Sequence, residues 1–274
     1  MPDAMHAVEL ARIIGEHALI AFGTALSTLL LFAGGARSAV HRQSMRGDGA
    51  PDVANARALR TIALFALLAV LAAALLFATL PRWIVLNGWL ALADQALTDA
   101  IHRSVPMPVV QAFGAITVLA SPVVLWVAAI VGALALLRHR RYDLALFWIA
   151  AIAGNGILTR VLKAIFVRAR PLYDHTLFTA AGWSFPSGHS SGAVAAYGAL
   201  AYVLIRLTPP RRHLAIILAA IATAFAVGCS RIFMQVHFAS DVLAGFATGL
   251  AWLSVCVMAA EIVRRRRPTN TIPS

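Results

Sequence analysis

Residues 143–171 read DLALFWIAAIAGNGILTRVLKAIFVRARP, an apolar run that passes without a break into a cluster of cations. Its first part, 143–165, is long and apolar enough to cross a hydrocarbon core of ~30 Å as one helix. The run ends in Lys163-Ala-Ile-Phe-Val-Arg-Ala-Arg170-Pro171, and Lys163 is the single lysine among 23 lysine and arginine residues. The stretch therefore predicts a membrane helix that carries an unusual basic group at one end.

The composition extends this prediction to the whole chain. Of the 274 residues, 61% are hydrophobic and 12% are charged, and the mean hydropathy is +0.81. These values exceed those usual for a soluble globular protein. Further apolar stretches long enough to span a bilayer lie at 18–36, 61–80, 109–137, 188–207, 213–232 and 238–263. The sequence predicts an all-α, polytopic membrane protein with seven membrane helices.

The positions of the arginines predict the orientation, because cytoplasmic loops retain Lys and Arg. Most arginines follow the first, third, fifth and last spans: Arg37, Arg42, Arg46, Arg57, Arg60, Arg138, Arg140, Arg141, Arg206, Arg211, Arg212 and Arg264 to Arg267. These segments share one side of the membrane if the N-terminus lies outside and the C-terminus lies in the cytoplasm. The net charge of +12 is then mainly a topology signal, and we expect no nucleic-acid partner.

No internal repeat or low-complexity linker divides the chain, which predicts one helical domain. We expect a six-helix core at 61–263, preceded at 1–60 by one additional membrane helix and an Arg-rich cytoplasmic loop. A basic cytoplasmic tail follows at 264–274. Residues 83–108 are half apolar and are expected to lie along the outer surface as an amphipathic segment. Their role is open between a packed loop and a substrate entry.

A cleaved secretory signal is the alternative for residues 1–36. Asp3, Glu9 and Glu16 leave this segment without a basic leading region, and cleavage would place the Arg-rich loop outside. We therefore expect a retained membrane helix.

The first motif with chemical potential is the pair Lys163 and Arg170. The two residues are seven apart, which is about two helical turns, so we expect them on one face of a helix that ends before Pro171. A guanidinium binds phosphate oxygens with two parallel hydrogen bonds, and an ammonium adds a compact charge. The alternative is that both cations extend to the lipid headgroups. For Arg160 and Arg168 we favour that alternative.

The second motif, Pro186-Ser187-Gly188-His189, precedes an apolar run and predicts the start of a helix. Free backbone N–H groups and the positive helix end make such a turn an anion site, and Gly188 allows close approach of the backbone. A plain helix cap is the alternative. The histidine next to the glycine favours a functional role.

The third motif contains Ser230-Arg231, His237 and Asp241. His237 and Asp241 are four apart at the start of the last span, so we expect them on one helix face. A carboxylate that accepts from one imidazole nitrogen leaves the other nitrogen free as a base or nucleophile. A structural hydrogen-bonded pair is the alternative. Because the predicted topology puts all three motifs on the same membrane face, we expect them to form one phosphate site there.

These motifs resemble those of the type 2 phosphatidic acid phosphatase superfamily, integral membrane lipid phosphatases that share a helical core with soluble bacterial acid phosphatases and vanadium haloperoxidases. The family pattern is a Lys, six residues and Arg-Pro; then Pro-Ser-Gly-His; then Ser-Arg, five residues, His, three residues and Asp. The sequence matches every fixed position within about 61–263. The span at 18–36 lies outside the usual six-helix core.

The resemblance implies a role for each matching residue. His237 would be the nucleophile that forms a phosphohistidine, oriented by Asp241, and His189 would protonate the leaving oxygen and then activate water. Lys163, Arg170, Arg231, Ser187 and the amide of Gly188 would hold the phosphoryl oxygens. The family uses no metal, and we expect no cofactor.

We therefore expect a lipid phosphatase or diphosphatase in the inner (cell) membrane, with its active site facing the periplasm or cell exterior. The family implies undecaprenyl diphosphate, phosphatidylglycerophosphate, phosphatidic acid or a lipid A phosphate as substrate. Possible headgroup contacts are Tyr173, Asp174, His175, Trp183 and Phe185. A lipid phosphotransferase with the same site and a non-catalytic headgroup transporter or structural membrane protein remain alternatives. The sequence does not indicate an oligomeric state.

Overall fold

The computed structural model describes residues 2–45, 51–85, 88–171 and 182–266. Its elements are α1 (Pro2–Glu16), α2 (Ala18–Met45), α3 (Pro51–Val85), α4 (Trp89–Ser104), α5 (Met107–Thr117), the 3-10 turn η1 (Val118–Ala120), α6 (Pro122–Arg138), α7 (Tyr142–Ile165), α8 (Gly188–Leu207), the 3-10 turn η2 (Pro210–Arg212), α9 (His213–Phe233) and α10 (Ala239–Arg266). Within these residues, seven helical segments are long and apolar enough to cross a membrane, as predicted.

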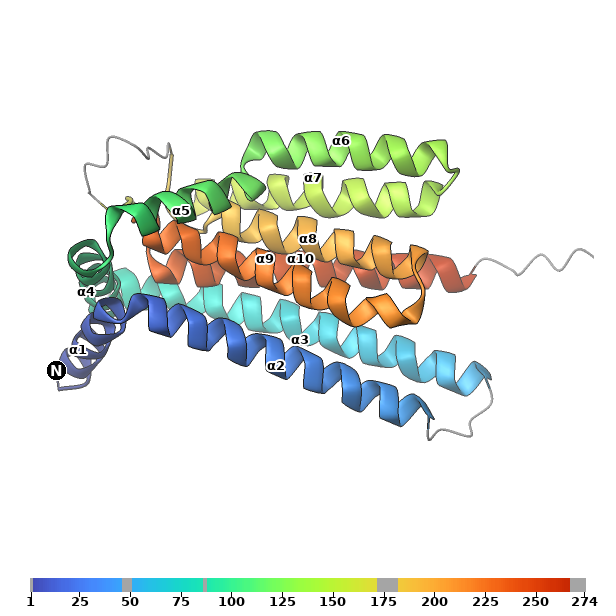
Figure 1. Ribbon diagram of the computed structural model, residues 1–274, viewed down its shortest axis with the longest axis horizontal. Coiled ribbons are helices and arrows are strands. Elements are labelled where there is room, and N and C mark those ends of the chain that lie inside the picture. The colour runs from blue at the N-terminus through green and yellow to red at the C-terminus, as the bar shows by residue number, and fades with distance from the viewer. Residues whose placement is uncertain (1, 46–50, 86–87, 172–181, 267–274) are drawn as a thin grey trace, which may run out of the picture.

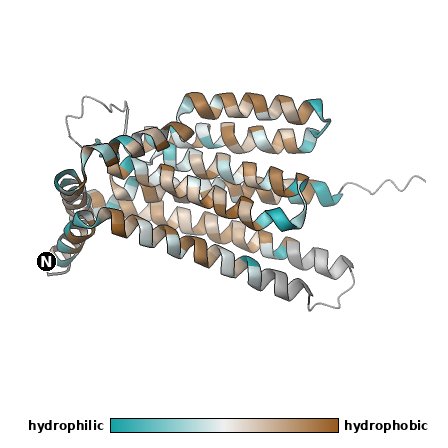
Figure 2. Ribbon diagram, viewed as in Figure 1, coloured by the Kyte–Doolittle hydropathy of each residue, from teal (hydrophilic) through white to brown (hydrophobic). Residues whose placement is uncertain are grey.

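The long helices run roughly side by side, and the C-terminal ends of α2, α6, α8 and α10, where many of the arginines lie, are at one end of the bundle (Figure 1). The other end carries α1, α4 and residues 166–171 and 182–187, which flank α7 and α8. Apolar residues cover the lengths of the helices, and hydrophilic residues gather at both ends (Figure 2). Many large apolar side chains are exposed on α3 and α6, among them Phe65, Leu75 and Val123. A membrane protein presents such surfaces to lipid.

The third predicted span, 109–137, is interrupted. α5 ends at Thr117, and a new helix begins after Ser121 with Pro122 at its first position. The Ser121 side chain accepts from the Val124 N–H, and Pro122 has no N–H to leave unsatisfied, so the sequence favours a helix start here. The interruption places Thr117 and η1 beside α8 and α9.

Two glycines allow α10 to lie close against α8. A Cβ atom at Gly245 would be 2.5 Å from the Ser187 carbonyl oxygen, and one at Gly249 would be 2.6 Å from the Ser191 carbonyl oxygen. Small residues at this spacing let helix backbones approach closely. The contact fixes the start of α8 against the start of α10, where two of the three motifs lie.

The expected outer segment is helical from Trp89 and packs against α1 across the end of the bundle (Figure 1). A Cβ atom at Gly15 would be 2.6 Å from the Ala100 Cβ, which shows how closely the two helices approach. Residues Pro2–Glu16 form a helix of their own, which the sequence reasoning did not anticipate. α10 also continues through Arg266, so the predicted tail at 264–274 begins within the helix.

Candidate active site

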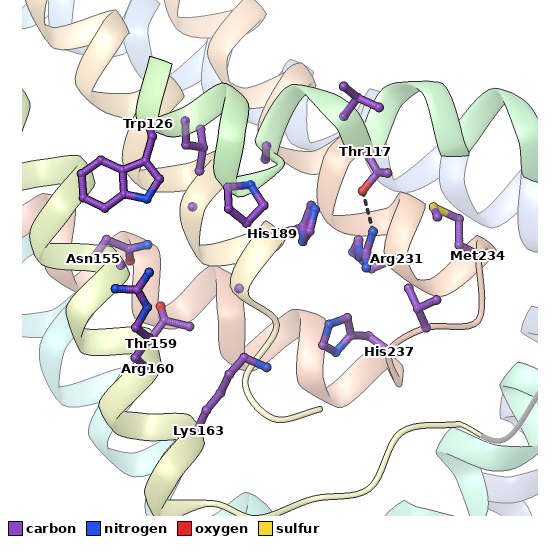
Figure 3. Close-up of a pocket in the computed structure, with 18 of the residues that line it drawn as sticks. Thr117, Trp126, Asn155, Thr159, Arg160, Lys163, His189, Arg231, Met234 and His237 are labelled. Carbon is purple, nitrogen blue, oxygen red and sulfur yellow. Dashed lines mark hydrogen bonds between the residues drawn. The ribbon is translucent and has the colours of Figure 1, made fainter. Parts of the chain in front are cut away.

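A cavity of about 680 Å³, which we call the main cavity, lies between the start of α6 and the ends of α7, α8 and α9 that carry the motifs (Figure 3). Its lining includes Lys163, Arg170, Gly188, His189, Arg231 and His237. The other two predicted site residues, Ser187 and Asp241, are fully buried next to it. The structure thus brings together three motifs that are widely separated in sequence.

His237 precedes α10 rather than standing on it, since the helix begins at Ala239. The prediction that His237 and Asp241 stand on one helix face is therefore wrong. The two side chains are nevertheless in contact, because His237 Nδ1 lies 3.4 Å from Asp241 Oδ2. The Ser184 hydroxyl donates to the same carboxylate oxygen at 2.5 Å, and the Phe238 N–H donates to it at 2.9 Å. These contacts fix the carboxylate against the Nδ1 side of the imidazole and leave Nε2 on the cavity side.

Burial also sets the protonation state of His237, whose side chain is 2% exposed. Loss of solvation disfavours the imidazolium, and burial lowers the pKa of His237 to about 3 despite the opposing effect of Asp241. The ring is therefore neutral near pH 7. With Nδ1 directed at the carboxylate, Nε2 carries the lone pair.

Arg170 lies beyond the helix on which it was expected. α7 ends at Ile165, and residues 166–171 are not helical, so the helical-face argument for Lys163 and Arg170 is wrong. Carbonyl groups orient Arg170 instead: NH1 donates to Val236 at 2.7 Å and Nε donates to Gly182 at 2.9 Å. NH1 also lies 2.9 Å from His237 Nε2. Burial lowers the pKa of Arg170, but a guanidinium remains charged at neutral pH.

Lys163 on the last turn of α7 and Arg231 on α9 supply two further cations. The Lys163 ammonium donates to the carbonyls of Trp183 and Ser184. Arg231 is 5% exposed, and its NH1 donates to Thr117 Oγ1 at 2.8 Å. Arg231 Nε is buried and has no partner among the described residues. A buried donor of this kind indicates a place for a ligand acceptor.

Ser187 caps α8, as the motif predicts. Its Oγ accepts from the N–H and the hydroxyl of Ser190, and its own N–H donates to the Asp241 carbonyl at 2.9 Å. The hydroxyl is fully buried within this cap, whereas Gly188 and His189 line the cavity. Direct phosphate binding by the Ser187 side chain is therefore unfavourable, and the backbone of the first helical turn is the better candidate.

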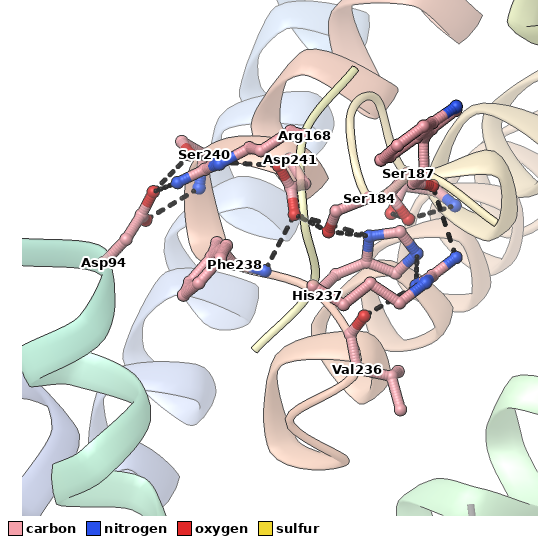
Figure 4. Close-up of polar contacts among 12 residues, drawn as sticks. Asp94, Arg168, Ser184, Ser187, Val236, His237, Phe238, Ser240 and Asp241 are labelled. Atoms are coloured by element: carbon pink, nitrogen blue, oxygen red, sulfur yellow. Dashed lines mark hydrogen bonds and ion pairs between the residues drawn. The ribbon is translucent and has the colours of Figure 1, made fainter. Parts of the chain in front are cut away.

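Arg168 does not extend to lipid headgroups, which corrects the sequence interpretation. Its side chain is 13% exposed and lies between two carboxylates (Figure 4). NH1 is 2.7 Å from Asp241 Oδ1, and NH2 is 2.9 Å from Asp94 Oδ2. The guanidinium also lies over the Phe238 ring, 4.3 Å from its centroid. Arg168 is therefore a buried counterion of the candidate orienting acid.

Asp94 is the residue that sequence reasoning missed. It lies on α4, is 4% exposed, and also accepts from the N–H and hydroxyl of Ser240. Burial raises the pKa of Asp94, and Arg168 opposes this rise. The sequence did contain a clue to this pair. Asp94 is an acidic residue in the half-apolar segment 83–108, and this segment lies on the same predicted membrane face as Arg168, a cation to which the predicted phosphate site gave no role.

The expected headgroup contacts have different outcomes. Phe185 is 2% exposed and packs against Phe77 and Phe166, so its assignment as a headgroup contact is wrong. Trp183 has an exposed side chain at this end of the bundle. Tyr173, Asp174 and His175 lie outside the described residues.

Comparison with known proteins agrees with the motifs. Two lipid A 1-phosphatases, from Rhizobium johnstonii and Rhizobium etli, are each 34% identical over 132 residues, which cover 43% of this chain and 50% and 53% of those proteins. A phosphatidylglycerophosphatase B from Bacillus subtilis is 34% identical over 134 residues, which cover 48% of this chain. The chain spans 64% of the length of that relative and about half of the other two.

A solved structure extends the similarity to most of the fold. The crystal structure of a transmembrane PAP2-type phosphatidylglycerolphosphate phosphatase from Bacillus subtilis superposes with a TM-score of 0.65 at 27% sequence identity, and the match covers 74% of this chain and 99% of that chain. The sequence model of the PAP2 superfamily matches residues 144–265, which contain all three motifs. The core formed by α7 to α10 therefore belongs to the PAP2 superfamily.

Proposed function

We propose that the protein is a membrane lipid phosphatase that removes a terminal phosphate from a lipid phosphate or diphosphate. The observation that carries this proposal is the environment of His237: a neutral imidazole with Nδ1 against Asp241 and Nε2 beside cations that line the main cavity. The names of the similar proteins support a lipid phosphate as substrate.

In the first step, the Nε2 lone pair of His237 attacks phosphorus and the ester P–O bond breaks. The leaving oxygen takes a proton from His189. Asp241 stabilises the positive charge that develops on His237, while Lys163, Arg170 and Arg231 stabilise the phosphoryl oxygens. Most of the acceleration of phosphoryl transfer comes from such positioning and charge stabilisation.

In the second step, His189 takes a proton from water as the water oxygen attacks phosphorus. The P–N bond breaks, inorganic phosphate is released, and His237 returns to its neutral form. The residues assigned to both steps supply charge and proton transfer without a further group.

The cavity also suits a lipid tail. Trp126, Leu125 and Ile152 form an apolar part of its lining. Trp126 lies on the opposite side of the view from His237 (Figure 3). We infer that the tail stays in the bilayer while the phosphate reaches the cationic part. The arginine distribution supports an inner-membrane protein whose site faces the periplasm, with undecaprenyl diphosphate, phosphatidylglycerophosphate and lipid A phosphates as candidates.

The test is release of phosphate from a panel of these lipids by purified protein in detergent with chelator present. We expect turnover by the wild type and a loss of at least about 10³-fold in His237→Ala. Labelled phosphate from the substrate that is bound covalently to the wild type, is released by acid and is absent from His237→Ala would identify the phosphohistidine. Equal, slow release by both proteins would contradict the proposal and favour a non-catalytic headgroup-binding protein.

A further inference from the structure

A second cavity, of about 560 Å³, lies at the end of the bundle where α6 is joined to α7 and where α10 ends (Figure 1). We call it the distal groove. It is lined by the first turns of α7, by α10, and by Tyr202 and Arg206 from α8. His189 and Arg206 stand near opposite ends of α8, about 25 Å apart along the helix axis. The distal groove is therefore separate from the candidate active site.

Most of the lining is apolar. It combines large exposed side chains, among them Leu146 and Val263, with the short side chains of Ala150, Ala259 and Ala260. Short side chains leave space between helices that larger side chains would fill. Because the apolar sides of a membrane bundle face hydrocarbon, this part of the groove suits an acyl chain.

The polar residues of the lining gather at helix ends. Tyr142 and Asp143 begin α7, and Arg206 and Arg264 lie in the last turns of α8 and α10. The apolar part of the groove thus extends toward the middle of the membrane, and the polar part lies at its surface. This order matches that of a phospholipid, whose headgroup lies at the surface above its chains.

Cations outnumber acids around the polar part. Residues 138–143 contain three arginines, residues 261–266 contain three more, and Arg206 is the seventh, whereas the acidic residues of these segments are Asp143 and Glu261. A surplus of this size is complementary to an anion. A basic pocket between membrane helices is a typical site for an anionic lipid headgroup.

Arg206 is available to such a headgroup, because Glu261 is already paired with other residues. Arg264 donates to Glu261 Oε2 from NH2 at 2.6 Å and from Nε at 3.1 Å, and the Tyr202 hydroxyl donates to Oε1 at 2.9 Å. Arg206 NH1 is 3.9 Å from Oε1, which is beyond hydrogen-bond distance. Within the part of the chain that the structure describes, Arg206 makes no hydrogen bond, and its side chain is 34% exposed.

We propose that the distal groove binds one phospholipid with an anionic headgroup, from the leaflet that the arginine distribution predicts to be cytoplasmic. An acyl chain lies against Ala150, Ala259 and Ala260, and the phosphate contacts Arg206, with Arg264 beside it. A headgroup that keeps a net negative charge gains more from the surrounding arginines than a zwitterionic headgroup does. This site goes beyond the proposed phosphatase function and does not depend on it.

The test is native mass spectrometry of the purified full-length protein in detergent. The probes are phosphatidylglycerol and phosphatidylethanolamine with the same oleoyl chains, and the Kd of the most tightly bound lipid is compared among variants. Arg206→Gln removes the headgroup contact, and Ala259→Leu fills the groove from an exposed position. The matched controls are Arg212→Gln at the same end of the bundle and Ala72→Leu on α3, both at exposed positions that do not line the groove.

We expect the wild type to bind phosphatidylglycerol at least about fivefold more tightly than phosphatidylethanolamine. Arg206→Gln should weaken binding of phosphatidylglycerol by about fivefold, which is the effect of one basic residue at a membrane surface. Ala259→Leu should weaken binding of both lipids by at least about fourfold, which is the effect of one displaced methylene group. Both controls should match the wild type. Cooperative thermal unfolding in detergent shows that each variant is folded.

Three results would overturn the proposal. Equal weakening by Arg206→Gln and Arg212→Gln would show general attraction to exposed arginines. Equal affinity of the wild type for the two lipids, or unaltered binding by Ala259→Leu, would reject an anionic lipid in the groove. A wild-type dimer that Ala259→Leu dissociates would assign the groove to a second copy of the chain. The groove variants do not line the main cavity, so each of these results leaves the proposed phosphatase function intact.

Discussion

Arg168 and Asp241 are 73 residues apart in sequence and form an ion pair of 2.7 Å behind the candidate nucleophile. The same guanidinium reaches Asp94 at 2.9 Å, so one cation neutralises two buried carboxylates (Figure 4). Asp94 comes from α4, which lies across the end of the bundle. The orienting acid of the site is thereby connected to a helix outside residues 144–265, which the PAP2 sequence model matches.

We predict that Arg168→Gln lowers both stability and turnover. Two buried carboxylates without a cation should cost about 3–5 kcal/mol of unfolding free energy. Because Asp241 would lose its fixed position, kcat should fall by more than about tenfold with little change in KM. Thermal unfolding in detergent and phosphate release measure the two effects. Arg103→Gln on the exposed end of α4 is the control, and an Arg168→Gln protein with wild-type stability and kcat would contradict the role.

The pH profile should lack an acidic fall in the range from pH 5 to pH 9. A nucleophilic imidazole is active when deprotonated, and burial lowers the pKa of His237 to about 3, so the nucleophile is lost only as pH falls toward that value. We expect kcat/KM to fall toward alkaline pH where His189, the proposed proton donor, loses its proton. Measurement of kcat/KM from pH 5 to pH 9 tests this prediction. Recovery of activity when the protein is returned from each pH to pH 7 is the control for folding. A half-maximal point near pH 6.5 on the acidic side, after correction for ionisation of the substrate, would show that His237 is not held neutral.

Lys163→Arg should lower kcat/KM by about tenfold although the charge is kept. The ammonium donates to two adjacent carbonyls, and a longer, planar guanidinium does not reproduce this compact arrangement of donors. Lys163→Gln should lose more, because the charge is removed as well. Phosphate release by the two variants makes the comparison. Unaltered activity of Lys163→Arg would mean that shape does not explain the single lysine.

Gly245→Ala should destabilise the protein by about 1–3 kcal/mol and reduce activity, because the new Cβ would be 2.5 Å from the Ser187 carbonyl oxygen. Gly23→Ala on α2 is the matched control: its Cβ would meet no atom within 4 Å, and alanine favours the helix. Thermal unfolding of both variants in detergent tests the difference. Similar unfolding temperatures would show that α8 and α10 can separate without loss of stability.

Much of the architecture was predictable because it depends on local properties. Hydrophobic length identified the seven candidate spans, and a Ser-Gly sequence before an apolar run identified the start of α8. Chain reversal between spans then placed the three motifs at one end of the bundle, where the main cavity lies. These predictions require only that a bilayer has a fixed thickness and that helices satisfy their own backbone hydrogen bonds.

The conformations of the connecting segments were less predictable. Arg170 was expected on a helix and is held by loop carbonyls, and His237 was expected on α10 and precedes it. Both residues still reach the cavity, because side-chain contacts with other segments, rather than helical periodicity, determine where a short connection lies.

The sequence by itself determined an all-α membrane bundle of PAP2 type and the residues of its three motifs. Only the tertiary structure decided that Arg168 is a buried counterion, that Asp94 belongs to the same network, and that Arg160 lines the cavity without a partner among the described residues. Each of these facts depends on where a charged side chain finds its counterion or cavity. That choice is made by packing between helices far apart in sequence, because a buried charge is stabilised by its three-dimensional neighbours and not by its neighbours along the chain.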